Sequence, residues 1–250
     1  MKSIKKALDI LDIFLKKETE LQLIEIAELA GQNKPTTYRI LQPLLEYGYV
    51  YQKEKRGKYG LGTKWLDFAS VIKENIVFSK VAIPYMEDLE REVDETVLLN
   101  INQNYKVSPI EIIPAKHIIK IEPDTKKPNI LYSTATGKIY LAFMKKHELQ
   151  SYLDTVTFQA LTYNTIRDLD QLKAELNTVR KTNIAYDNEE ANLEVRGIAS
   201  GIFDHEKNNV GSVCMIGPIN RLTREKMSSL APIIKKYALE ISQKLGFKET

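Results

Sequence analysis

The chain has 250 residues, of which 43% are hydrophobic and 28% charged, which fits one large globular domain or two ordinary ones. No apolar run approaches the roughly 20 residues that span a bilayer, and Asp9 and Asp12 interrupt the first segment, so we expect neither membrane spans nor a signal peptide. The single cysteine, Cys214, excludes an intramolecular disulfide and a cysteine-rich metal site, and we expect a cytoplasmic protein.

The positive charge lies at one end of the chain. Residues 1–62 hold 11 of the 36 basic residues and 8 of the 33 acidic ones, which accounts for the whole net charge of +3. A partner with phosphate groups is therefore expected to bind the first quarter of the chain. The excess is small, and an ordinary solvated surface also carries such a charge.

Three helices are predicted before residue 47. The first begins at Ser3 as a candidate N-cap, and its apolar positions follow helical spacing: Ile4, Ala7, Leu8, Leu11, Phe14 and Leu15. The second spans Leu23 to Ala30 and ends at Gly31 in a left-handed conformation. The third begins at Asn33, with Pro35 in its first turn, and turns Ile40, Leu41, Leu44 and Leu45 inward.

A basic hairpin follows these helices. Residues 49–51 and 59–61 read as two strands, joined by a turn that contains Lys53, Lys55, Arg56 and Lys58 against one acid, Glu54. Two short helices joined by a glycine turn and followed by such a hairpin are typical of a winged helix-turn-helix.

The third helix is the predicted DNA-reading helix. Its solvent face presents Lys34, Thr36, Tyr38, Arg39 and Gln42. Arginine and glutamine side chains can make paired hydrogen bonds to guanine and adenine, whereas Lys34 and the wing residues Lys55 and Arg56 suit phosphates. Pro43 lies inside this helix, where proline bends or ends a helix, so the reach of Gln42 depends on its effect.

The rest of the chain predicts a linker and an α+β domain. Helices are expected over 63–78, which links the winged domain of residues 1–62 to a domain of residues 79–250, and over 79–93. Strands are expected over 96–102, 106–113, 118–122, 130–133, 195–204 and 210–216, and helices over 136–145, 147–153, 169–182 and 224–245. This order suggests a mixed sheet covered on one side by helices.

Several segments resemble one family. Three N-terminal segments resemble the DNA-binding domain of the IclR family of bacterial regulators: SIKKALDILDIF, LQLIEIAELAGQNKPTTYRILQPLLEYGYV and KYGLG. Further segments resemble the effector-binding domain of the same family: LYSTATGKIYLAF, and DNEEANLEVRGIASGIFD followed by VGSVCMIGP. The resemblance implies a C-terminal domain similar to the GAF fold, a dimer or tetramer on a palindromic operator, and repression of catabolic genes under control of an organic or sugar acid.

The same resemblance assigns effector contacts to Ala135, Thr136, Asp187, Gly197, Cys214 and Ile216, and Gly137 joins them on physical grounds. Small residues at a helix N terminus leave backbone N–H groups for a carboxylate, although they also permit close helix–sheet packing. Asp187 would accept from a ligand hydroxyl or cap the next turn. Gly197 stands where the family often has cysteine and would widen the pocket, while Cys214 and Ile216 occupy positions that are often polar and would make its wall less polar. These departures suggest a larger or more apolar effector than a two-carbon acid.

Other functions are weaker alternatives. Cys214 with His205 or His117 would be needed for a thiol enzyme, but no catalytic, cofactor or zinc motif accompanies them, so we expect no enzyme, cofactor or metal. A winged helix that binds protein in place of DNA is the main rival, and a collapsed effector pocket that senses nothing is another. Salt-dependent DNA binding separates the first rival from a regulator.

Overall fold

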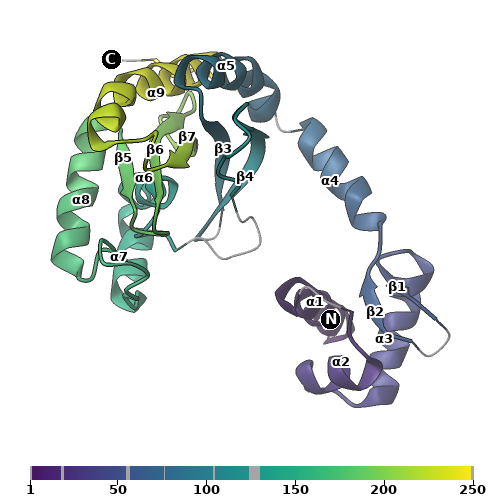
Figure 1. Cartoon of the computed structure of the whole chain (residues 1–250). Coiled ribbons are helices and arrows are strands. Elements are labelled where there is room, and N and C mark those ends of the chain that lie inside the picture. Colours follow the sequence, from purple (N-terminus) through teal and green to yellow (C-terminus); the bar gives the residue numbers. More distant parts are fainter. Residues whose placement is uncertain are drawn as a thin grey trace. The chain divides into compact units, whose positions relative to one another are not determined.

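The computed structural model describes residues 2–17, 20–54, 57–75, 77–103, 105–123 and 130–248 (Figure 1). The chain divides into two compact units, residues 1–75 and 76–250. None of the described helices is long and apolar enough to cross a bilayer.

The first unit packs three helices against a short hairpin. Its elements are α1 (Lys2–Lys17), α2 (Leu23–Leu29), α3 (Lys34–Glu46), β1 (Val50–Gln52), β2 (Tyr59–Leu61) and α4 (Lys64–Asn75). The strands pair antiparallel with Tyr51 opposite Gly60, and Leu21 forms a bridge to Tyr59 on the far side of β2. The core of this unit contains Ile10, Leu11, Phe14, Leu21, Ile26, Leu41, Val50 and Tyr59.

The first helix differs from its prediction in two ways. Lys2 is already helical, so Ser3 is not the N-cap. Ile4, Leu8 and Leu15 are more than half exposed, whereas Leu11 and Phe14 are buried as predicted together with Ile10. Helical periodicity identified an apolar stripe, but the stripe is wider than the surface that α2 and α3 cover, so one edge of it remains exposed.

The helix predicted for the linker is shorter in the structure. The helix expected over 63–78 ends at Asn75, and α5 (Val77–Val93) begins two residues later. The predicted second helix therefore starts before residue 79. Trp65 of α4 is partly exposed and donates its indole N–H to the carbonyl of Tyr49 at 2.9 Å, while its ring packs against Tyr49 and Phe68.

The second unit contains one five-stranded antiparallel sheet in the order β4-β3-β7-β6-β5. The strands are β3 (Thr96–Gln103), β4 (Lys106–Ile113), β5 (Ala185–Asn188), β6 (Val195–Phe203) and β7 (Asn209–Pro218). The helices besides α5 are α6 (Ala135–Phe143), α7 (Lys146–Thr155), α8 (Leu169–Thr182) and α9 (Arg224–Lys244).

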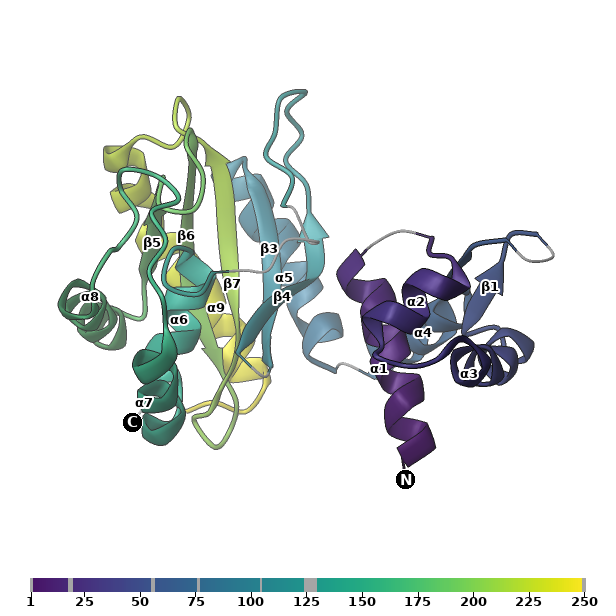
Figure 2. The same ribbon diagram turned by 90° about the horizontal axis from the view of Figure 1, so that it is seen from below.

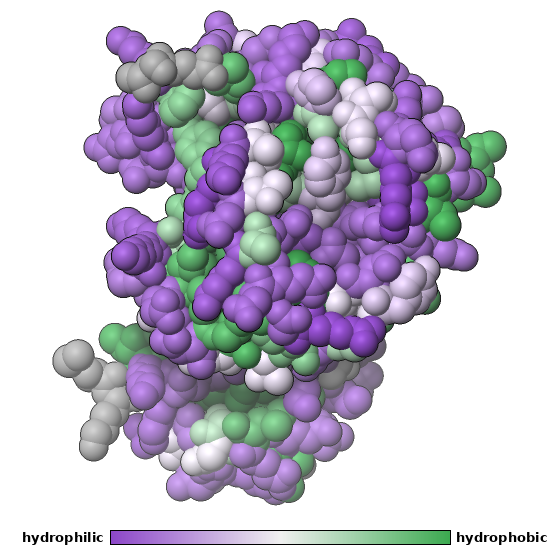
Figure 3. Space-filling view, turned by 90° about the vertical axis from the view of Figure 1, so that its left-hand side faces the viewer, coloured by the Kyte–Doolittle hydropathy of each residue, from purple (hydrophilic) through white to green (hydrophobic). Residues whose placement is uncertain are grey.

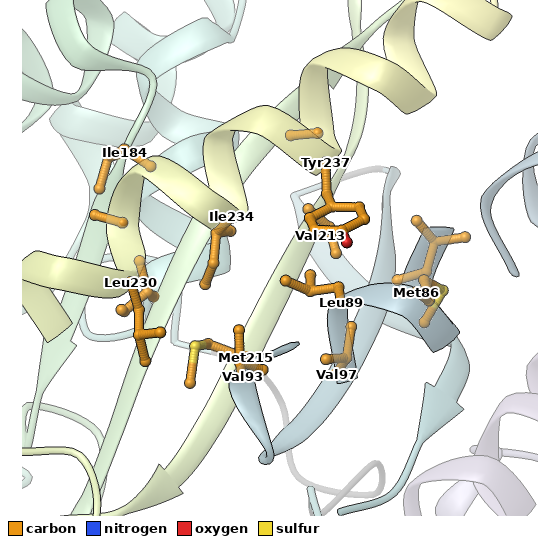
Figure 4. Packing of buried hydrophobic residues seen from close by; sticks show 14 of the residues in the cluster. Met86, Leu89, Val93, Val97, Ile184, Val213, Met215, Leu230, Ile234 and Tyr237 are labelled. Atoms are coloured by element: carbon orange, nitrogen blue, oxygen red, sulfur yellow. The ribbon is translucent and has the colours of Figure 1, made fainter. Parts of the chain in front are cut away.

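Helices cover both faces of the sheet, so the prediction of one covered face was wrong (Figure 2). One core lies between the sheet and helices α5 and α9, and Figure 4 shows Leu89, Ile234 and Tyr237 meeting Val213 there. The other core lies under α6 and α8 and contains Cys214 from the opposite side of the same strand. Successive side chains of a strand point to opposite faces of the sheet. Because strands such as β7 carry apolar residues on both faces, helices must pack against each face to bury them.

Two predicted strands are absent. Residues 118–122 form no strand, and Ile118 and Ile119 are exposed. Residues 130–133 form a turn in which the Ser133 N–H donates to the carbonyl of Ile130 at 3.0 Å. Both segments have β-forming composition, but no strand of the sheet pairs with them, and composition alone does not make a strand. Conversely, the short edge strand β5 was not predicted.

The α8 side of the molecule is mostly hydrophilic with scattered apolar patches (Figure 3). Helix α8 buries Leu172, Leu176 and Val179, and its charged residues are exposed apart from the half-buried Glu175. It begins at the predicted residue, with the Asp168 carboxylate accepting from the N–H of Gln171 at 2.8 Å. It ends at Thr182, and the C-cap Asn183 has a φ of 54°.

Candidate DNA interface and effector site

The turn before α3 has the predicted geometry. Gly31 has a φ of +60°, which confirms its left-handed conformation. Asn33 caps α3 as predicted, because its side-chain oxygen accepts from the N–H of Thr36 at 2.9 Å. The Thr37 hydroxyl, which was not predicted to matter, is buried and donates to the Asn33 carbonyl at 3.1 Å. The start of α3 is thus fixed by its own polar residues and by the core.

The outer face of α3 carries the predicted side chains. Lys34, Tyr38 and Arg39 are exposed, and Thr36 and Gln42 are half-buried. Among the described residues, no hydrogen bond or ion pair engages the side chains of Lys34, Arg39 or Gln42. Their polar groups are therefore available for an external partner.

Pro43 does not end the helix. α3 continues to Glu46, and the Tyr47 N–H donates to the Pro43 carbonyl at 3.0 Å. Pro43 is exposed, and so is Arg39, whose carbonyl loses its usual intrahelical donor. An exposed carbonyl can be hydrated, so a proline is tolerated on this side of the helix.

The hairpin forms the predicted wing. Its turn is closed by the Lys53 N–H, which donates to the Lys58 carbonyl at 3.1 Å, and by the Gln52 amide, which donates to the Gly57 carbonyl at 3.0 Å. Lys53 and Lys58 are exposed. The predicted phosphate contacts Lys55 and Arg56 lie outside the described residues.

One acidic residue beside the wing was missed. The Tyr51 hydroxyl donates to the Glu20 carboxylate at 2.6 Å, and this carboxylate also lies 3.9 Å from the Lys53 ammonium. The Tyr51 ring lies so close to Gly60 that a Cβ there would be 2.7 Å from it. The hydrogen bond to Glu20 raises the pKa of Tyr51. The two residues lie 31 positions apart, so only the strand-like contact of Leu21 with β2 brings them together.

The sheet brings the predicted effector residues together. Asp187, Gly197 and Ile216 are direct partners across β5, β6 and β7, and Cys214 lies two residues from Ile216 on the same face. That face is the one under α6, because Cys214 belongs to the core that contains Ala135. Asp187, Gly197 and Cys214 are buried, whereas Ile216 is partly exposed.

The N terminus of α6 has fewer free backbone N–H groups than predicted. Thr134 is its N-cap, and its hydroxyl accepts from the N–H of Gly137 at 3.1 Å, so that donor is already used. A Cβ on Gly137 would lie 2.3 Å from the Leu131 carbonyl oxygen. The glycine is therefore required by close packing. Ala135 and Thr136 are also buried.

Asp187 caps the turn that follows β5. One carboxylate oxygen accepts from the N–H groups of Glu190 at 2.8 Å and Ala191 at 3.4 Å. Burial raises the pKa of Asp187 to about 7, although the Glu190 N–H opposes the shift. Asp187 can therefore exist in either protonation state near neutral pH.

A buried lysine, which was not predicted, ties α6 to this turn. The Lys138 ammonium lies 2.6 Å from the Glu190 carboxylate, donates to the Tyr186 carbonyl at 2.8 Å and lies 3.5 Å from Glu175. Lys138 is 1% exposed. Burial raises the pKa of Glu190, and Lys138 opposes that shift. A lysine inside an otherwise apolar helical segment was the available signal.

The arrangement around Cys214 is not that of a reactive thiol. The thiol is buried and donates to the Met215 carbonyl at 3.4 Å, and burial raises its pKa. His205 is exposed, and His117 lies 3.1 Å from the Asp94 carboxylate. Among the described residues, no three His, Cys, Asp or Glu side chains are grouped to hold a metal ion.

Two hollows lie elsewhere. A cavity of about 170 Å³ is lined by Asp94, Glu95, His117, Arg221 and Lys226 with three apolar residues. An open hollow of about 640 Å³ lies beside the wing and includes Tyr51 and Lys53. Neither is lined by a predicted effector residue.

Comparison with known proteins identifies both units. Residues 3–54 match the IclR helix-turn-helix domain, and residues 70–243 match the C-terminal domain of bacterial IclR transcriptional regulators. A helix-turn-helix-type transcriptional regulator of Haemophilus influenzae is 32% identical over 249 residues, which cover 97% of this chain and 92% of that protein.

Solved structures agree in fold. The Thermotoga maritima IclR structure has a TM-score of 0.73 and 32% identity and covers 99% of this chain and 100% of that one. An IclR homologue of Microbacterium hydrocarbonoxydans, solved with 4-hydroxybenzoate, has a TM-score of 0.81 at 17% identity, over 98% of this chain and 99% of that one. With a family model covering most of its length, the chain belongs to the IclR family of helix-turn-helix transcriptional regulators.

Proposed function

We propose that this chain is a repressor of catabolic genes that binds a palindromic operator as a homodimer or homotetramer and responds to an organic or sugar acid. The observation that carries the DNA-reading part is the outer face of α3, where Lys34, Arg39 and Gln42 have no partner among the described residues. Arg39 and Gln42 would read bases, helped by Thr36 and Tyr38, and Lys34 with Lys55 and Arg56 would bind phosphates. The protein is not an enzyme in this proposal.

The test is binding to the DNA upstream of the protein's own gene and its neighbours at two salt concentrations. Arg39→Ala should weaken specific binding by about 1–3 kcal/mol and leave non-specific binding less affected. Arg224→Ala, which removes an exposed arginine of α9, is the matched control. Loss of binding by both variants alike, or salt-insensitive binding, would contradict the assignment of α3.

The effector is proposed to bind under the N-terminal part of α6, against Ala135, Thr136, Gly137, Asp187, Gly197, Cys214 and Ile216. The support is the row of Asp187, Gly197 and Ile216 across three strands, with Cys214 beside it. Since Gly137 has given its N–H to Thr134, a carboxylate has fewer backbone donors here than a fully open helix end provides. The apolar Cys214 and Ile216 favour a larger acid with an apolar body.

Thermal unfolding with a panel of carboxylates tests this site, because a ligand of the folded state raises the unfolding temperature. 4-Hydroxybenzoate and pyruvate are a suitable large and small pair. Ile216→Ser should shift preference toward the smaller acid. If no carboxylate stabilises the protein while operator binding remains intact, the effector proposal fails and the DNA-binding proposal stands.

A further inference from the structure

A second polar group lies on the α6 face of the sheet, two residues along β7 from the proposed effector residue Cys214. Asn100 of β3 and Ser212 of β7 are direct partners across the two strands. Asn100 is 3% exposed and Ser212 is fully buried. The Asn100 side-chain nitrogen and the Ser212 hydroxyl have no hydrogen-bond partner among the described residues.

Asn102 adds an acceptor to this group. It lies two residues beyond Asn100 on the same face of β3, about 7 Å further along the strand. Its amide nitrogen donates to the Asn209 side-chain oxygen at 2.6 Å, while its own oxygen is buried without a partner in the described structure. The Asn209 amide donates to the carbonyls of Ile202 and Gly211, at 3.1 and 2.9 Å, so these bonds fix both amide orientations.

The neighbouring polar groups are already satisfied. The Asn183 side chain exchanges two 3.0 Å hydrogen bonds with the backbone of Gly201, the partner of Ser212 on β6. A Cβ on Gly201 would lie 2.9 Å from the side chains of both Asn183 and Asn209, and 3.2 Å from Ile139 of α6. The unpartnered atoms of Asn100, Asn102 and Ser212 thus adjoin a fixed amide network that α6 covers.

Buried polar atoms without partners are rare in native proteins and indicate a missing ligand or water. The three groups offer a donor, an acceptor and a hydroxyl that does both, and no described hydrogen bond or ion pair brings a charged side chain to them. That combination suits hydroxyl groups, which both donate and accept, and offers no counter-charge to a carboxylate.

We propose that Asn100, Asn102 and Ser212 form a second ligand site, which takes an uncharged molecule with hydroxyl groups on neighbouring carbons. Asn102 and Asn209 are half-buried and mark the side of the site nearer to solvent. Ser212 lies two residues from Cys214 and four from Ile216 on the same face of β7, so this site adjoins the proposed effector site but uses other side chains. The proposal does not depend on that effector.

The site makes an unusual prediction about stability. Ser212→Ala removes a buried hydroxyl that has no partner, so the unliganded variant should unfold at the same or a higher temperature than the wild type. Ser200 is the matched control, since it is equally buried but donates to the Asn183 carbonyl at 2.8 Å. Ser200→Ala should therefore lower the unfolding temperature by about 2–4 °C.

Calorimetric titration of the full-length protein with glycerol, erythritol and xylitol tests the ligand. We expect saturable binding of at least one polyol to wild type and Ser200→Ala, and at least about tenfold weaker binding to Ser212→Ala and Asn100→Leu. Variant comparison is needed because concentrated polyols stabilise proteins generally. The proposed site would be overturned if no polyol bound saturably, or if Ser212→Ala bound as tightly as the wild type. It would also be overturned if unliganded Ser212→Ala were less stable than the wild type, because that result would indicate an ordered water bound to the hydroxyl.

Discussion

Lys138 of α6 and Glu190 of the turn after β5 form a buried ion pair, with 2.6 Å between the ammonium nitrogen and the carboxylate oxygen. The pair joins the helix that carries Ala135 to the turn that Asp187 caps. The ion pair thus holds together the two elements that form the proposed effector site, although neither Lys138 nor Glu190 is a proposed effector contact.

Replacing Lys138 should destabilise the protein strongly. Lys138→Met leaves Glu190 buried without its cation, and such a loss costs about 3–5 kcal/mol. Denaturant unfolding measures the change, with Lys173→Met at an exposed position of α8 as the control. The double variant with Glu190→Gln should recover part of the loss. If Lys138→Met alone matches the control, the pair does not hold α6 in place.

Asp187 should make stability depend on pH. Its folded pKa of about 7 lies above the ordinary 3.8, so between these values the folded state keeps a proton that the unfolded chain releases. This contribution is therefore full below about pH 4 and falls as pH rises to 7, by up to about 4 kcal/mol.

Unfolding of wild type and Asp187→Asn from pH 5 to 8 measures this effect. The wild type should lose stability relative to the variant as pH rises. Asp168→Asn, which removes the charge of an exposed capping carboxylate of α8 and leaves an oxygen to accept the bond, is the control for the same change at an exposed site. A difference between wild type and Asp187→Asn that stays constant over this range would show that burial does not control the Asp187 proton.

Two glycines should respond to alanine for different reasons. Gly137→Ala places a methyl group 2.3 Å from the Leu131 carbonyl, so α6 must move, at a cost of about 3 kcal/mol or more. Gly31→Ala meets no atom within 4 Å but must hold a φ of +60°, which costs about 1–2 kcal/mol. Thermal unfolding compares them, and an equal small loss for both would argue against tight packing at α6.

The cap of α3 should separate stability from DNA binding. Asn33→Ala removes the acceptor of the Thr36 N–H and should cost about 1 kcal/mol. Asn33→Asp keeps the cap but adds a negative charge beside Lys34 at the proposed DNA surface. It should therefore fold as well as wild type and bind operator DNA more weakly. Unchanged DNA affinity for Asn33→Asp would place the start of α3 away from phosphate.

The sequence determined the local order of this protein. Gly31, Asn33 and Pro35 define the turn and the start of α3 through preferences that act within a few residues. Asp168 likewise fixes the start of α8 as its N-cap. The family resemblance, read from short segments along the whole chain, was confirmed by the match of both domains. The proposed contacts of Arg39 and of Asp187 remain predictions.

Only the tertiary structure decided which residues lie together. The buried pair of Lys138 and Glu190 spans 52 positions, and Asn100 meets Ser212 across 112, because strand order is set by the packing of two helical layers and not by local preference. The same packing left Ile118 without a strand partner. In the first unit, Leu8 of α1 is exposed because it lies outside the core that α1 shares with α2 and α3. Local patterns show that a residue is apolar or polar, but its partner depends on which surfaces the whole chain covers.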